Sequence, residues 1–135
     1  MIRLAVFLIP LMGIFFVSCA DGIVSECPAE QKIAVNATFS SIQENVFGKS
    51  CALSGCHTGS NPQSGLNLTP GAAYANTVNK IAYADVMYIK PGSADESYLF
   101  MKINAETSAM PPTGKLRQEV IDSIRVWINN GALNN

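Results

Sequence analysis

The stretch Cys51-Ala52-Leu53-Ser54-Gly55-Cys56-His57 holds two of the four cysteines of the 135-residue chain and its single histidine. A single histidine excludes every site that needs two of them from one chain, such as the HExxH zinc site of metalloproteases. It also excludes a haem with two histidine ligands from this chain. The chemistry of the stretch therefore depends on two closely spaced thiols and on the imidazole that directly follows the second one.

Two cysteines followed directly by a histidine are typical of covalent attachment of haem c. The two thiols add across the vinyl groups of the porphyrin, and the adjacent histidine supplies one axial ligand to the iron. The usual spacer has two residues, whereas four separate Cys51 from Cys56, a spacing that occurs in some multihaem cytochromes. Gly55 leaves room for a flat macrocycle close to the backbone. We therefore predict one haem c per chain, bound through Cys51 and Cys56, with His57 as an axial ligand.

A six-coordinate haem needs a second axial ligand, and methionine is the natural candidate in a chain with one histidine. Met1 and Met12 belong to the apolar N-terminal segment. Met87 lies in an apolar extended run and Met101 lies in a helical pattern, so both are expected in the core. Met110 lies in a loop and precedes two prolines, whose fixed φ restricts that loop. Met110 is therefore the predicted second ligand of the iron, and a thioether ligand raises the reduction potential.

The first residues of the chain have the pattern of an export signal. Arg3 precedes an apolar run of about 14 residues that ends in small residues, and the run is shorter than the about 20 residues of a membrane-spanning helix. Residues 16–19 resemble the lipobox of bacterial lipoproteins, in which signal peptidase cuts before a cysteine that is then lipidated. We predict a signal peptide over residues 1–18, a lipid anchor on Cys19 and a tether over residues 19–35. An ordinary cleaved signal and an uncleaved anchor are the alternatives.

Export would place the chain in the bacterial cell envelope, on the periplasmic side or at the cell surface, where paired thiols oxidise. The whole chain has 9 Lys and Arg against 10 Asp and Glu, so it lacks the basic excess of a nucleic-acid-binding protein. Charged residues make up 14% and apolar residues 48% of the chain, which favours a packed core over disorder. The carboxylates are scattered and no nucleophile stands beside a free base. We therefore expect an electron carrier and not an enzyme.

Apolar residues recur at helical spacing near both ends of residues 36–135, which predicts a small, mostly helical domain with long loops. The first helix is expected to have its N-cap at Asn36 or Thr38 and to end at Gly48, before the paired cysteines. A short second helix is expected over residues 72–78. Residues 59–70 are rich in Gly, Asn, Pro and Ser and predict a loop.

Residues 86–89 are apolar and predict an extended segment before a turn at Pro91-Gly92. Ser93-x-x-Glu96 has the spacing of a capping box, which predicts the start of a third helix that runs through Ile103. The last helix has the most regular pattern and is expected to stop at Gly131. Its apolar face consists of Leu116, Val120, Ile121, Ile124, Trp127 and Ile128.

These features together resemble a small class I cytochrome c. That family has an N-terminal helix running into the haem motif, a methionine-proline loop and a C-terminal helix that crosses the first. More narrowly, the chain is similar to the cytochrome c-like domains of bacterial lipoproteins and planctomycete-type multidomain proteins. The matching pieces are Ser54-Gly55-Cys56-His57-Thr58-Gly59, Gly65-Leu66-Asn67-Leu68, Ser97-Tyr98-Leu99, Met110-Pro111-Pro112 and Trp127-Ile128-Asn129-Asn130-Gly131-Ala132. The resemblance implies an all-α, cytochrome c-like domain over residues 36–135 that exchanges electrons with redox partner proteins of the envelope.

Other interpretations of the cysteines stay open. Cys51 and Cys56 could form a disulfide in an oxidising compartment, and the chain would then be a haem-free lipoprotein that serves as a binding or scaffold module. A zinc site could use Cys27, Cys51, Cys56 and His57 as its four ligands. The distance of Cys27 from the other three in the sequence disfavours this site. A third alternative is a domain accessory to a larger redox enzyme.

Overall fold

The computed structural model describes residues 34–135. The predicted signal peptide over residues 1–18, the lipidation of Cys19, the role of Cys27 and almost all of the tether over residues 19–35 lie outside this part. Its elements are α1 (Phe39–Ile42), the π-helix η1 (Gln43–Cys51), the short 3₁₀-helix η2 (Gln63–Gly65), α2 (Ala73–Thr77), β1 (Ile81–Tyr83), β2 (Val86–Met87), α3 (Tyr98–Asn104) and α4 (Gln118–Asn129). Within the described part, no helix has both the length and the apolar composition needed to cross a membrane.

The fold is mostly helical, as predicted, but it is not purely α-helical, because β1 and β2 form a small antiparallel hairpin. Ile81 pairs with Met87 in this two-stranded sheet. The turn residues Ala84 and Asp85 both have positive φ, which hairpin turns usually achieve with Asn-Gly or Asp-Gly. Because the sequence lacks that signal, only the second strand was predictable as an extended segment.

The first helix is longer and wider than the sequence predicts. Thr38 is the N-cap, and its hydroxyl accepts a hydrogen bond of 3.3 Å from the backbone N–H of Ser41. The expected stop at Gly48 is wrong, because the chain continues as the π-helix η1 to Cys51. The wide turns persist to the end, where the N–H of Ala52 donates to the carbonyl of Phe47 at 2.7 Å. The first cysteine of the pair therefore belongs to the last turn of a helix.

The predicted capping box of the third helix does not form. Glu96 pairs with the Lys90 ammonium on the surface and does not reach back to Ser93. Ser97 is fully buried, where its hydroxyl donates to the carbonyl of Ser93 at 2.8 Å and accepts from the N–H of Lys90 at 2.9 Å. This serine fastens the preceding loop, and α3 begins at the next residue.

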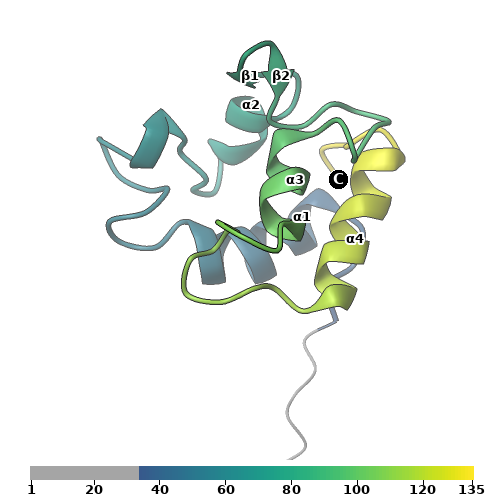
Figure 1. Ribbon diagram of the computed structural model, residues 1–135, viewed down its shortest axis with the longest axis horizontal. Helices are drawn as coiled ribbons and strands as arrows, with labels where there is room; N and C mark the ends of the chain where they lie inside the picture. Colours follow the sequence, from purple (N-terminus) through teal and green to yellow (C-terminus); the bar gives the residue numbers. More distant parts are fainter. Residues whose placement is uncertain (1–33) are drawn as a thin grey trace, which may run out of the picture. The chain divides into compact units, whose positions relative to one another are not determined.

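The last helix agrees with its prediction. Its buried residues are Val120, Ile121, Ile124, Trp127 and Ile128, and Gly131 follows it with a φ of 96°. The ring centroids of Trp127 and of Phe39 in α1 lie 5.7 Å apart. The N–H of Ser40, also in α1, donates to the carbonyl of Asn135 at 2.8 Å. Figure 1 shows α3 and α4 side by side, with α1 behind them. The core thus joins the first, third and last helices, and the long loops lie around it.

Candidate functional site

Four residues predicted to bind haem lie around one cavity. Cys51, Cys56, His57 and Met110 all line a cavity of about 460 Å³, a volume typical of cofactor sites. Much of the remaining lining is apolar and comes from Val46, Phe47, Leu66, Leu68, Leu99, Ile103 and Ile124. The structure therefore brings the cysteine turn and the methionine loop together, although they are far apart in the sequence.

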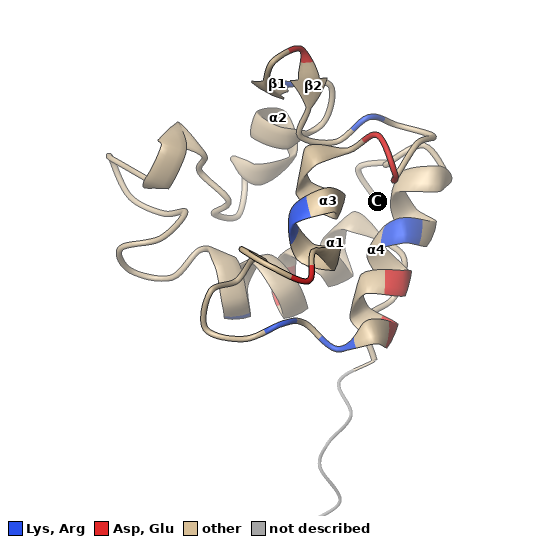
Figure 2. Ribbon diagram, in the orientation of Figure 1, with Lys and Arg blue, Asp and Glu red and all other residues tan. Residues whose placement is uncertain are grey.

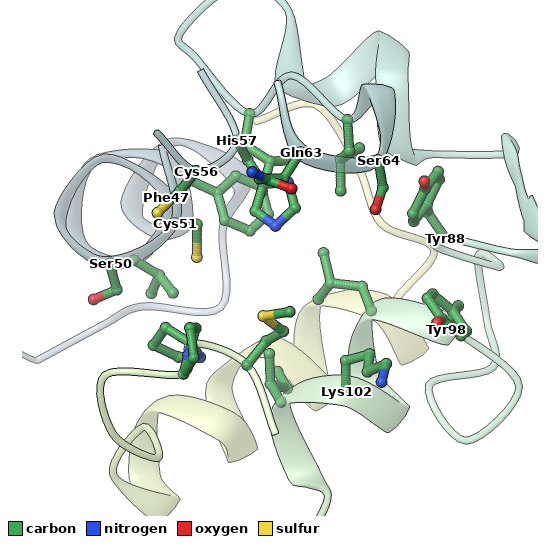
Figure 3. A pocket seen from close by; sticks show the side chains of 18 of the residues that line it. Phe47, Ser50, Cys51, Cys56, His57, Gln63, Ser64, Tyr88, Tyr98 and Lys102 are labelled. Atoms are coloured by element: carbon green, nitrogen blue, oxygen red, sulfur yellow. The ribbon is translucent and has the colours of Figure 1, made fainter. Parts of the chain in front are cut away.

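The backbone between the two cysteines folds into a short turn at the end of η1. The N–H of Cys56 donates to the carbonyl of Leu53 at 2.9 Å, and that of His57 donates to the carbonyl of Cys51 at 3.1 Å. Gly55 has a φ of 78°, a conformation that favours glycine. Figure 3 shows both sulfur atoms on the same side of the imidazole. The turn takes up the longer spacer, so that both thiols and the imidazole stay at one end of the cavity.

Cys51 and Cys56 are free thiols in the structure. Burial raises the pKa of the Cys51 thiol to about 11, and the neighbouring Cys56 adds to the rise. Because the thiolate is the nucleophilic form, Cys51 is a weak nucleophile at neutral pH. Cys51 is therefore expected to react only slowly with solutes from the solvent.

The surroundings of the His57 side chain leave one of its polar atoms without a partner, as expected where a bound group completes a site. Its backbone is fixed on both sides, since its carbonyl also accepts from the N–H of Leu68 at 2.9 Å. Its Nδ1 atom is buried and has no hydrogen-bond partner among the described residues, although buried polar atoms are nearly always paired. Figure 3 shows the imidazole reaching toward the cavity. The residues therefore fit a ligand that brings its own polar or metal atom.

The donor set fits a haem better than a metal ion held by protein ligands alone. Within residues 34–135, no group of three or more His, Cys, Asp or Glu side chains is arranged to hold a metal ion. A structural zinc site needs four protein ligands, and Cys27, the fourth member of the zinc set considered from the sequence, lies outside the described residues. In a haem the macrocycle supplies four ligands, so that one imidazole and one thioether complete the coordination.

Met110 lies at the rim of the cavity and is 39% exposed. Its N–H donates to the carbonyl of Lys102 in α3 at 3.0 Å. Pro111, which is buried, and Pro112 also line the cavity. The loop between α3 and α4 is thus fastened on both sides of the methionine, as the prolines predict.

The other two methionines of the described part do not line the cavity. Met87 is half-buried in β2, so the prediction that it is a core residue is only partly right. The prediction that Met101 is a core residue is wrong, because its side chain is 45% exposed. Helix α3 is short and buries its other apolar residues, namely Leu99, Phe100 and Ile103. Met101 falls between them on the outer face, since successive helical residues are about 100° apart.

Three residues that were not predicted as site residues line the cavity away from the cysteines. They are Tyr88, Tyr98 and Lys102, and Figure 3 shows them on the side opposite Cys51. The two phenol rings lie edge to face with centroids 6.2 Å apart, and the Lys102 ammonium lies 5.8 Å from the centroid of Tyr98. One feature of the sequence could have indicated this cluster: Lys102 follows Tyr98 by four residues and so lies on the same face of α3.

One comparison with known proteins gives a match. Residues 54–114 match the family model described as planctomycete cytochrome C. No curated protein and no solved structure matches the chain. The matched stretch includes Cys56, His57 and Met110 but begins after Cys51, so it leaves the first cysteine and the two end helices outside. Over this stretch the chain is similar to planctomycete cytochrome C, which supports the resemblance to a cytochrome c-like protein.

Proposed function

We propose that this chain is a membrane-anchored, monohaem c-type cytochrome that carries electrons in the bacterial cell envelope. The convergence of Cys51, Cys56, His57 and Met110 on one largely apolar cavity carries the proposal. The match of residues 54–114 to planctomycete cytochrome C supports it.

Cys51 and Cys56 would hold the porphyrin through two thioether bonds, and His57 and Met110 would be the axial ligands of its iron. When bound, the haem supplies a one-electron redox couple whose potential depends on these ligands and on the surrounding polarity. The chain positions both ligands through backbone hydrogen bonds, at the carbonyl of His57 and the N–H of Met110. Leu66 and other apolar lining residues exclude water, which favours a high potential.

Electron exchange with redox partner proteins requires an accessible edge of the haem. Met110 is 39% exposed, and Leu53, within the cysteine turn, is 40% exposed. Apolar side chains that solvent reaches therefore lie at Met110, on the cavity, and at Leu53, in the adjacent cysteine turn. A partner that docks there would approach the haem closely without any opening of the fold.

Anchoring rests on the N-terminal sequence. Cleavage after residue 18 would leave a lipidated Cys19, and residues 19–35 would tether the domain formed by residues 36–135 to the bilayer. Lipid chains contribute about 0.8 kcal/mol per buried methylene. The cell envelope, on the periplasmic side or at the cell surface, follows from this mode of export.

A haem-free lipoprotein with a Cys51–Cys56 disulfide, acting as a binding or scaffold module, is the alternative. One observation favours it: the two thiols are close enough for Cys56 to raise the pKa of Cys51. Covalent attachment and a disulfide exclude each other, because each uses both sulfur atoms.

Expression of the full chain in a periplasm with a haem-attachment system separates the two functions. The denatured protein should give the pyridine haemochrome spectrum of haem c at one haem per chain. Cys51→Ser should shift or abolish this spectrum, whereas Cys27→Ser is the matched control and should leave it unchanged. Colourless protein with a Cys51–Cys56 disulfide would contradict the cytochrome and favour the scaffold module.

A further inference from the structure

The cavity has one cationic end. Among the described residues that line it, Lys102 is the only side chain with a full charge at neutral pH. Lys102 lies with Tyr88 and Tyr98 on the side opposite Cys51 (Figure 3). The cysteines and the lysine therefore mark two opposite ends of a largely apolar cavity.

Lys102 has no carboxylate partner within the described part of the chain. The ion pairs there use Lys90, Lys115, Arg117 and Arg125. Lys102 is half-buried, and its ammonium lies over the face of the Tyr98 ring. It is the only charged residue of α3, as Figure 2 shows. A half-buried ammonium without a counter-charge is less stable than a paired one, so its position at the cavity favours an anionic ligand group.

The chemistry of haem places two carboxylates at this end. The two vinyl groups lie on one edge of the macrocycle, and the two propionates lie on the opposite edge. Thioether bonds to Cys51 and Cys56 would fix the vinyl edge at the cysteine turn. The propionates would then point toward the opposite end of the cavity, where Lys102 lies.

We propose that Lys102 binds the porphyrin carboxylates and thereby sets the direction in which the macrocycle enters the cavity. This inference rests on the proposed function. Lys102 acts as a positioning residue: it touches no reacting atom, and the Tyr98 ring beneath its ammonium limits its movement. The positive charge of the lysine would pair with the negative carboxylates at one end, while the two thiols bind the vinyl groups at the other.

Absorbance titration of the full, haem-free chain tests the proposal with two probes, iron protoporphyrin IX and its dimethyl ester. The probes differ only at the carboxylates. The unmodified chain should bind the free acid more tightly than the ester, by roughly three- to tenfold. Lys102→Met should remove this preference, and Lys102→Arg should keep it because the charge remains. Lys80→Met is the matched control, since Lys80 is exposed and outside the cavity, and it should keep the preference as well.

Equal binding of both probes by the unmodified chain would overturn the proposal, and so would a preference that survives in Lys102→Met. Failure to bind either probe would contradict the haem site itself, and thus the proposed function. If Lys102→Met does not fold, Lys102→Gln serves as the neutral variant. In covalently loaded protein at fixed pH, loss of the cation should lower the reduction potential relative to Lys80→Met, and an unchanged potential would contradict the contact.

Discussion

Met110→Ala and Met101→Ala form a matched pair of perturbations. The two side chains are similarly exposed, at 39% and 45%, but only Met110 lines the cavity. Full burial of a methionine side chain contributes about 1.5–3 kcal/mol, so partial burial contributes about 1 kcal/mol to each. In the haem-free chain both variants should therefore lose about 1 kcal/mol of unfolding free energy, or about 4–8 °C in Tm.

The haem-loaded variants should differ sharply. Met110→Ala removes the proposed thioether ligand, so the oxidised protein should lose the weak long-wavelength absorption that thioether-to-iron charge transfer gives in the cytochrome c family. Its reduction potential should also fall, because a thioether ligand favours reduced iron. Met101→Ala should keep both the band and the potential. Absorption spectra and potentiometric titration of the two proteins, with haem retained through the cysteines, measure this difference.

A band that survives in Met110→Ala would refute the assignment of Met110. If that band instead disappears in Met101→Ala or Met87→Ala, the substituted methionine is the ligand. A band absent from the unmodified protein would indicate an open sixth position on the iron, and thus ligand binding in place of electron transfer.

Three further predictions concern the anchor, the core and the thiols. Cys19→Ser should leave unprocessed precursor on a gel, and normal processing would contradict lipidation. Trp127→Phe should cost about 2 kcal/mol in denaturant unfolding, because the ring is buried and its N–H donates to the Leu133 carbonyl at 2.9 Å; a loss below about 0.5 kcal/mol would contradict this packing. In the haem-free chain, the Cys51 pKa of about 11, against an ordinary value of 9.0, should slow its alkylation at pH 8 about a hundredfold relative to an ordinary thiol. The pKa of Cys51 is higher in the folded than in the unfolded chain. The stability linked to the protonated thiol is therefore present below about pH 9 and is lost as pH rises toward 11. Denaturant unfolding curves across this pH range would measure the loss.

The sequence predicted those features that depend on local pattern or on chemistry. The apolar face of α4 repeats with helical period, and Gly131 follows it with the positive φ that helix ends favour. The adjacent Cys56 and His57 predicted two residues that line the cavity. The prolines after Met110 predicted a loop with restricted backbone conformation. These signals lie within a few residues of one another, so they needed no knowledge of the tertiary structure.

The features that the sequence did not predict depend on partner choice, helical geometry or tertiary packing that no residue pattern specifies. Glu96 had the spacing of a capping residue, but it pairs with Lys90 across a turn. Gly48 ends no helix, because wide helical turns continue past it to Cys51. Lys102 gains its place at the cavity from the packing of α3 against α4, which no local pattern shows.

Covalent attachment of haem through Cys51 and Cys56 is tested most directly by mass spectrometry of a protease digest. The full chain would be produced in a periplasm with a haem-attachment system, and the peptide that contains residues 51–57 would be isolated under denaturing conditions. We predict a coloured peptide that carries one haem on two thioether bonds. A colourless peptide with a Cys51–Cys56 disulfide, or with two free thiols, would contradict the cytochrome.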